Sequence, residues 1–195
     1  MRHPEKASFG GLRVIAGDRR GKKLFSVSGL ATRPTASRVR EAVFNMISDT
    51  VPNAVVLDLY AGTGILGIEA LSRGARFALF VDNSHASLEI IRKNIAACRF
   101  QSKSDVMNTD IKSELMRLRA YNAAFNLVFM DPPYHKGLIQ TTLCDLHNSK
   151  ALATRALIVV EHALTEPPPI NMVCFHLKDQ RKYGKTLVSF VDYTI

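Results

Sequence analysis

Short apolar runs alternate with helical patterns along most of the chain, and this alternation is the feature that most constrains its fold. The runs typical of strands cover residues 55–59, 78–82, 104–108, 125–130 and 156–161. Helical patterns lie between them, over about 65–73, 84–99, 111–120 and 137–147. Such alternation predicts a mostly parallel sheet with helices on both faces. The expected class is a Rossmann-like, doubly wound α/β fold.

The C-terminal part departs from this alternation. After three prolines at residues 167–169, two strand patterns cover about 171–177 and 186–193. A basic segment, residues 178–185, joins them and is expected to form the turn. The pattern predicts an antiparallel hairpin at the edge of the sheet, which brings the expected sheet to seven strands.

The N-terminal part has its own organisation. Residues 1–10 are expected to form a loose terminus. Strand patterns over 12–16 and 22–27 predict a small basic hairpin. Ser37 is expected to cap a following helix over about 38–49.

Positive charge is concentrated in this N-terminal part. Residues 1–40 hold ten Lys and Arg against two acidic residues, whereas residues 41–195 hold sixteen against fifteen. A local excess of positive charge favours a polyanionic partner, because neutralised phosphates release their counterions. The alternative is a solvated basic tail that serves only solubility. We therefore expect a basic, nucleic-acid-binding extension over residues 1–50 and a main domain over residues 51–195.

Other classes of protein are disfavoured by composition. No stretch approaches the roughly 20 apolar residues of a membrane span, and the polar start lacks the apolar core of a signal peptide. The three cysteines, Cys98, Cys144 and Cys174, are widely spaced, and the six histidines show no ligand spacing. We expect a cytoplasmic protein with no metal and no membrane contact.

The segment that follows the strand expected over residues 55–59 contains three glycines in the spacing GxGxxG, at Gly62, Gly64 and Gly67. Glycines let the backbone come close to a ligand at a helix N-terminus. Asp82 ends the next strand, where a carboxylate can accept hydrogen bonds from two ribose hydroxyls. This pattern alone fits a nicotinamide enzyme as well as any other nucleotide-binding protein.

Four successive strands end in an aspartate: Asp58, Asp82, Asp110 and Asp131. Asp58 would disfavour a bound pyrophosphate but can support a ligand that carries an ammonium group. Asp110 can accept a hydrogen bond from an adenine amine. The amino-acid nucleoside S-adenosylmethionine uses all of these acceptors. Each aspartate taken alone could instead be a helix N-cap or a loop residue.

A double-proline motif, Asp131-Pro132-Pro133-Tyr134, follows the strand over residues 125–130. Consecutive prolines remove two N–H donors and fix φ, so their carbonyls do not pair with a neighbouring strand. A carboxylate, two carbonyls and an aromatic face then lie at the edge of the sheet where ligands bind. This acceptor-rich arrangement suits a flat base with an exocyclic amine. The alternative is an ordinary strand exit with Tyr134 in the core.

These features, together with several longer blocks, resemble the RsmD family of S-adenosylmethionine-dependent methyltransferases. The blocks, in chain order, are Arg13-Val14-Ile15-Ala16-Gly17, Thr32-Arg33-Pro34-Thr35, Arg38-Val39-Arg40-Glu41-Ala42-Val43-Phe44-Asn45, Asp58-Leu59-Tyr60-Ala61-Gly62-Thr63-Gly64, Leu66-Gly67-Ile68-Glu69-Ala70-Leu71-Ser72-Arg73-Gly74-Ala75, Asp131-Pro132-Pro133-Tyr134, Val159-Val160-Glu161-His162 and Arg181-Lys182-Tyr183-Gly184. The resemblance covers nearly the whole chain after about residue 11. One departure is Asp82 followed by Asn83, where a glutamate is more usual.

The resemblance implies methyl transfer to the N2 amine of a guanine in 16S ribosomal RNA, with S-adenosylhomocysteine as the other product. The implied catalytic residues are Asp131, Pro132, Pro133 and Tyr134. The implied cofactor residues are Asp58, Tyr60, Ala61, Gly62, Gly64, Asp82, Asn83, Asp110 and Ile111. The implied RNA contacts are Arg19, Arg20, Arg33, Pro34, Thr35, Arg38, Arg40, Arg181, Lys182 and Tyr183.

Several points stay open at this level. Arg38 and Arg40 could instead cap or pair with Glu41 or Glu69 on a solvated helix face. The double-proline motif also serves enzymes that methylate the N6 amine of adenine in RNA or DNA, which is the nearest alternative. A binding module without activity would leave Asp131 idle, and a nicotinamide dehydrogenase would not use the double-proline motif. We expect a monomer that acts on 16S RNA, either naked or within the small subunit.

Overall fold

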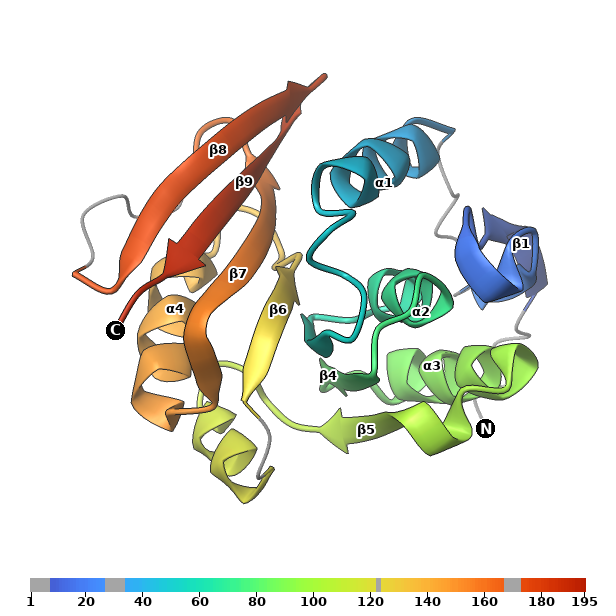
Figure 1. Cartoon of the computed structure of the whole chain (residues 1–195), viewed down its shortest axis with the longest axis horizontal. Coiled ribbons are helices and arrows are strands. Elements are labelled where there is room, and N and C mark those ends of the chain that lie inside the picture. Colours follow the sequence, from blue (N-terminus) through green and yellow to red (C-terminus); the bar gives the residue numbers. More distant parts are fainter. Residues whose placement is uncertain (1–7, 27–33, 122–123, 167–172) are drawn as a thin grey trace, which may run out of the picture.

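A seven-stranded sheet forms the centre of the structure (Figure 1). The computed structural model describes residues 8–26, 34–121, 124–166 and 173–195. In spatial order the strands are β5 (Ser104–Asn108), β4 (Phe77–Asp82), β3 (Val55–Leu59), β6 (Phe125–Met130), β7 (Leu152–Ala163), β9 (Thr186–Tyr193) and β8 (Phe175–Tyr183). The first five are parallel, and β9 and β8 form an antiparallel hairpin at one edge. The predicted fold class is confirmed.

Helices cover both faces of the sheet (Figure 1). On one face lie α1 (Pro34–Met46), α2 (Ile65–Ser72) and α3 (His85–Cys98), which share one apolar core with the sheet. On the other face, α4 (Leu138–Ser149) and a 3-10 helix, Leu115–Ala120, share a second core with it. Because both faces are covered, all five residues of β3 are buried, and four of them are apolar, with Asp58 as the exception.

The strand order changes direction between β3 and β6. The chain passes from β3 to β4 and β5 on one side, and returns to β6 on the other. Open α/β sheets bind ligands in the crevice at the carboxyl ends of their strands at such a switch point. The glycine segment after β3 and the double-proline motif after β6 therefore start from neighbouring strands.

The predicted N-terminal hairpin is confirmed, with two shifts of boundary. Strand β1 (Ser8–Arg13) pairs antiparallel with β2 (Lys23–Ser26), so it begins inside the segment expected to be loose. Helix α1 begins at Pro34, and the prediction that Ser37 caps it was wrong. Proline suits the first turn of a helix, because its missing N–H would have no partner there.

Two polar side chains fasten this hairpin to the sheet domain. Glu69 on α2 accepts hydrogen bonds from the backbone nitrogens of Ile15 and Ala16, at 2.8 and 3.0 Å. Asn94 on α3 bonds both backbone groups of Phe25 and also donates to the carbonyl of Thr63 in the glycine segment, at 2.9 Å. The hairpin thus contacts the segment expected to bind the cofactor. The division of the chain at residue 50 stays a prediction.

Two further boundaries differ from prediction. The helix expected over 111–120 is only the 3-10 helix Leu115–Ala120, because Asp110 accepts the backbone N–H groups of residues 112–114 in a turn. The basic segment 178–185, expected to be a turn, belongs mostly to β8, and only Gly184 and Lys185 connect β8 to β9. No helix in the described part of the chain is long and apolar enough to span a bilayer.

Candidate active site

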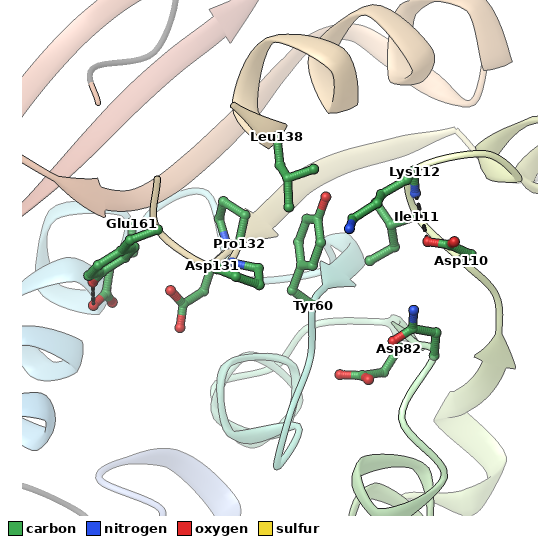
Figure 2. Close-up of a pocket in the computed structure, with 12 residues that line it drawn as sticks. Tyr60, Asp82, Asp110, Ile111, Lys112, Asp131, Pro132, Leu138 and Glu161 are labelled. Carbon is green, nitrogen blue, oxygen red and sulfur yellow. Dashed lines mark hydrogen bonds between the residues drawn. The ribbon is translucent and has the colours of Figure 1, made fainter. Parts of the chain in front are cut away.

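A pocket of about 680 Å³ opens at the carboxyl ends of the parallel strands (Figure 2). It brings together most of the predicted catalytic and cofactor residues, namely Tyr60, Asp82, Asn83, Asp110, Ile111, Asp131, Pro132, Pro133 and Tyr134. Three further residues line it that were not predicted to belong to the site: Lys112, Leu138 and Glu161. Within the described part of the chain, no cluster of three His, Cys, Asp or Glu could hold a metal ion.

The acidic side chains of the pocket form two groups. Figure 2 shows Asp82 and Asp110 toward one end and Asp131 and Glu161 toward the other, with the ring of Tyr60 between them. The Tyr60 hydroxyl lies 2.8 Å from the hydroxyl of Thr142 on α4, and this hydrogen bond fixes the ring. One end of the pocket is therefore separated from the other by an oriented aromatic side chain.

Asp82 links strand β4 to the glycine segment. One carboxylate oxygen accepts the backbone N–H of Gly62 at 2.9 Å, and the other accepts that of Ser84 at 2.8 Å. These bonds fix the direction of the carboxylate, and each oxygen keeps a lone pair for a further donor. Gly62 adopts a φ of 55°, which favours glycine. The geometry suits the predicted acceptance of ribose hydroxyls.

The third glycine serves packing of helix against sheet. A Cβ at Gly67 would lie 2.4 Å from the ring of Phe80 on β4, so no larger residue fits. The backbone N–H of Gly67 donates to Asp58 at 2.9 Å. Asp58 is 2% exposed and does not line the pocket, and burial raises its pKa to about 8. Asp58 thus holds the glycine segment in place through its hydrogen bond with Gly67. Its direct contact with a cofactor stays a prediction.

Asp131 and Glu161 form a pair of carboxylates on neighbouring strands. Met130 is in register with Val160, so the next residue of each chain segment lies beside the other. The Tyr134 hydroxyl donates to Glu161 at 3.2 Å. Asp131 is exposed to the open pocket, but desolvation by the surrounding protein atoms, and secondly the charge of Glu161, raise its pKa to about 7. Burial also raises the pKa of Glu161.

Glu161 is a site residue that the sequence reading did not assign. It belongs to the block Val159-Val160-Glu161-His162 and follows an uninterrupted apolar run, which is the same signal that singled out the aspartates. The strand was expected to end there, but β7 continues to Ala163. Its neighbour in space, Asp131, became evident only from the pairing of β6 with β7.

Some of the residues predicted to contact RNA have exposed side chains, and others are held by contacts within the protein. Exposed ones are Arg20, Arg38, Arg181 and Lys182, and Tyr183 is half-buried. Arg181 pairs with Asp179 at 2.8 Å. Arg19 is half-buried, and its Nε donates to the carbonyl of Cys98 at 2.7 Å. Arg33 and the side chains of Pro34 and Thr35 lie outside the described residues.

Arg40 does not lie on the exposed basic surface where we expected it. It is 6% exposed, its Nη2 donates to the carbonyl of Arg13 at 2.9 Å, and its Nε lies 3.9 Å from Glu69. The alternative pairing with Glu69 is the one found, although inside the protein and not on a solvated face. Burial lowers the pKa of Arg40. A phosphate on the protein surface is therefore not its partner.

Comparisons with known proteins show which family of proteins the chain is similar to. Residues 12–192 match the family described as "Conserved hypothetical protein 95". The chain is 37% identical to "Ribosomal RNA small subunit methyltransferase D" of Escherichia coli, over 95% of this chain and 91% of that protein. A protein of the same name from Haemophilus influenzae is 32% identical, over 81% and 82% of the two chains.

A solved structure gives the same result for the fold. The structure described as "Putative methyltransferase yhhF from Escherichia coli" superposes with a TM-score of 0.83 and 33% identity, over 94% of this chain and 98% of that chain. The match to the family covers nearly the whole chain, from the first basic hairpin to the last strand. The chain therefore belongs to this family, the RsmD family whose sequence blocks it shares.

Proposed function

We propose that the protein transfers the methyl group of S-adenosylmethionine to the exocyclic N2 amine of a guanine in small-subunit ribosomal RNA. The observation that carries this proposal is a single pocket that holds cofactor acceptors, Asp82 and Asp110, and a proton-accepting carboxylate, Asp131. The name of the Escherichia coli relative supports ribosomal RNA as the substrate. The assay is transfer of tritiated methyl to small subunits, and the expected product is N2-methylguanosine.

The charge of the pocket fits this cofactor better than a dinucleotide. Four carboxylates line the pocket against one cationic side chain, Lys112. A sulfonium and an ammonium group are attracted to such a lining, whereas a pyrophosphate is repelled. The volume lies within the roughly 300–1,000 Å³ of ligand pockets. A titration that shows binding of NAD, and none of S-adenosylmethionine, would overturn this assignment.

The residues of the double-proline motif activate the amine in this proposal. A guanine N2 nitrogen is a weak nucleophile, because its lone pair is delocalised into the ring. Asp131 and the carbonyl of Pro132 accept its two N–H groups, which lets the nitrogen turn its lone pair away from the ring. Tyr134 contributes an exposed ring face for stacking, worth roughly 1–3 kcal/mol. Most of the acceleration then comes from position and fixed dipoles.

The cofactor, when bound, supplies an electrophilic methyl group and leaves as S-adenosylhomocysteine. The chain supplies the rest. Asp131 holds the amine in place, and its raised pKa makes its carboxylate a competent acceptor for the proton that the amine gives up. Tyr60 and Pro132 contribute apolar surface to the pocket on either side of the place where the amine would lie.

The pH dependence of methyl transfer follows from Asp131. Asp131 can take up the proton of the amine only when it is ionised, and its pKa is about 7. We expect kcat/KM for RNA to rise as pH increases through about 7 and then level off. The measurement is initial rate against pH, with S-adenosylhomocysteine affinity measured over the same range as the control. A flat profile across pH 7 would contradict the role given to Asp131.

The exposed basic hairpin is proposed to bind RNA phosphates. Replacing Arg20 with Ala should weaken binding to all RNA sequences equally and reduce the slope of log K against log salt by about 1. The control is Lys150→Ala, at the end of α4 on the opposite face of the sheet (Figure 1). An unchanged salt slope for Arg20→Ala would place the RNA on another surface.

An adenine-N6 methyltransferase is the second candidate, because the same motif can hold either amine. We also propose that the chain is a monomer, with a methyltransferase domain over residues 51–195 and an RNA-binding extension over residues 1–50. Ribosomal RNA is its substrate, either naked or within the small subunit.

A further inference from the structure

A second, smaller cavity meets the cofactor pocket at Asp131 and Glu161, which line both. Its volume is about 180 Å³, on the order of ten times what one water molecule requires. Apolar side chains from α1, from the start of α2 and from the sheet form its walls, among them Val39 and Leu66. Its polar members are Arg40, Asp131 and Glu161. We call this space the inner cavity.

Arg40 borders the inner cavity, but its Nε is enclosed by protein atoms and does not face it. Its Nε is the only buried side-chain nitrogen or oxygen, among the described residues, that has no hydrogen-bond partner. The nearest acidic oxygen, on Glu69, lies 3.9 Å away, which is too long for a hydrogen bond. A buried donor without a partner is unfavourable, but a ligand in the inner cavity does not reach this one.

The two carboxylates have unused acceptors in the same place. Within the described part of the chain, no group donates a hydrogen bond to the side chain of Asp131, and only Tyr134 donates to that of Glu161. Two neighbouring carboxylates repel each other, and this repulsion is the second cause, after desolvation, of the raised pKa of Asp131. A ligand that presents two adjacent N–H donors would relieve this repulsion.

We propose that the pairing edge of the target base enters the inner cavity beside Asp131 and that Glu161 selects guanine there. This inference rests on the proposed function. The pairing edge of guanine presents, in order, the N2 amine as donor, N1–H as donor and O6 as acceptor. The cavity offers Asp131 and Glu161 as two adjacent acceptors. The N2 amine and the N1–H group of guanine thus each meet an acceptor.

The same arrangement rejects adenine. When the N6 amine of adenine lies at Asp131, the next atom on its edge is N1, which is an acceptor. It would face the Glu161 carboxylate, also an acceptor, and the two would repel. A site that hydrogen-bonds one substrate discriminates strongly against an analogue that leaves its buried groups unpaired. Glu161 therefore decides between the two bases that the double-proline motif alone accepts.

The first test replaces Glu161 with Ala, with the exposed Glu89→Ala as the matched control. We expect kcat/KM for guanine methylation in small subunits to fall on the order of 10²-fold, with S-adenosylhomocysteine affinity within about twofold. The acidic limb of the pH profile should also move to lower pH, because Asp131 loses a negative neighbour and keeps Tyr134, Asp58 and Arg40 around it. The charge of Glu161 alone produces this shift, so the fall in guanine methylation at unchanged cofactor affinity is the readout that tests base selection.

The second test fills the inner cavity. Val39→Phe projects a larger side chain into it from α1, and Met46→Phe, exposed on the same helix, is the control. We expect Val39→Phe to lose methyl transfer and to keep S-adenosylhomocysteine binding. Loss of cofactor binding in parallel, in either Val39→Phe or Glu161→Ala, would assign the cavity to the cofactor and overturn the inference.

The wild-type product separates the inference from the proposed function. If the wild-type enzyme yields N6-methyladenosine, the proposed function itself fails. If it yields N2-methylguanosine while Glu161→Ala and Val39→Phe both retain activity within about threefold, only the inference is overturned.

Discussion

Replacing Asp131 with Ala should reduce methyl transfer on the order of 10³-fold or more, with S-adenosylhomocysteine binding changed by no more than about twofold. Asp131 lines the pocket beside Glu161, at the end away from the cofactor acceptors Asp82 and Asp110 (Figure 2). Its carboxylate has no other hydrogen-bond donor among the described residues. It is therefore free to hold the amine and accept its proton.

The measurement is single-turnover methyl transfer together with a titration of S-adenosylhomocysteine. The exposed Asp49→Ala is the control for a lost negative charge. A parallel loss of transfer and of cofactor affinity would mean that Asp131 belongs to the cofactor site. If Asp131→Ala kept activity close to wild type, the catalytic role proposed for Asp131 would be wrong.

Replacing Glu69 with Ala should lower the free energy of unfolding by about 3–5 kcal/mol, because it leaves a buried charge without its partner. The Glu69 side chain is fully buried and accepts hydrogen bonds from Ile15, Ala16 and Arg73. It is also the acidic neighbour of Arg40. The substitution therefore leaves two backbone N–H groups and a buried guanidinium without their acceptor.

Urea unfolding measures this effect, and hydrogen exchange of the Ile15 and Ala16 amides locates it. Glu89→Ala, at an exposed ion pair on α3, should change stability by no more than about 0.5 kcal/mol. Suppose that Glu69→Ala lowered the free energy of unfolding by less than about 1 kcal/mol and left the Ile15 and Ala16 amides protected from exchange. Glu69 would then not anchor the hairpin to the sheet domain.

The parallel strands could be predicted closely from sequence. The expected bounds of β3, β5 and β6 agree with the structure. Central parallel strands are covered on both faces, so β3 and β6 appear as mostly apolar runs, each with a single polar residue, and have clear ends. Their carboxyl ends also share one edge of the sheet, which is why Asp82, Asp110 and Asp131 line one pocket as expected.

The errors concern features that depend on tertiary contacts. Arg40 looks like its exposed neighbour Arg38 in sequence, and only the packing of α1 against Glu69 buries it. Glu161 lies beside Asp131 because β6 pairs with β7. The two residues are about thirty positions apart, and no local sequence pattern shows which strands will pair. The basic segment at residues 178–185 was taken for a turn because charge obscures the strand pattern at a sheet edge, where alternate residues face solvent.

The most direct test is transfer of tritiated methyl from S-adenosylmethionine to small ribosomal subunits from cells that lack this protein. Naked 16S RNA and duplex DNA serve as parallel substrates, and nucleoside analysis identifies the product. The proposed function predicts label in N2-methylguanosine from a ribosomal substrate, and the comparison of subunit with naked RNA shows which one the enzyme uses. Label in N6-methyladenosine, or in DNA alone, would contradict it.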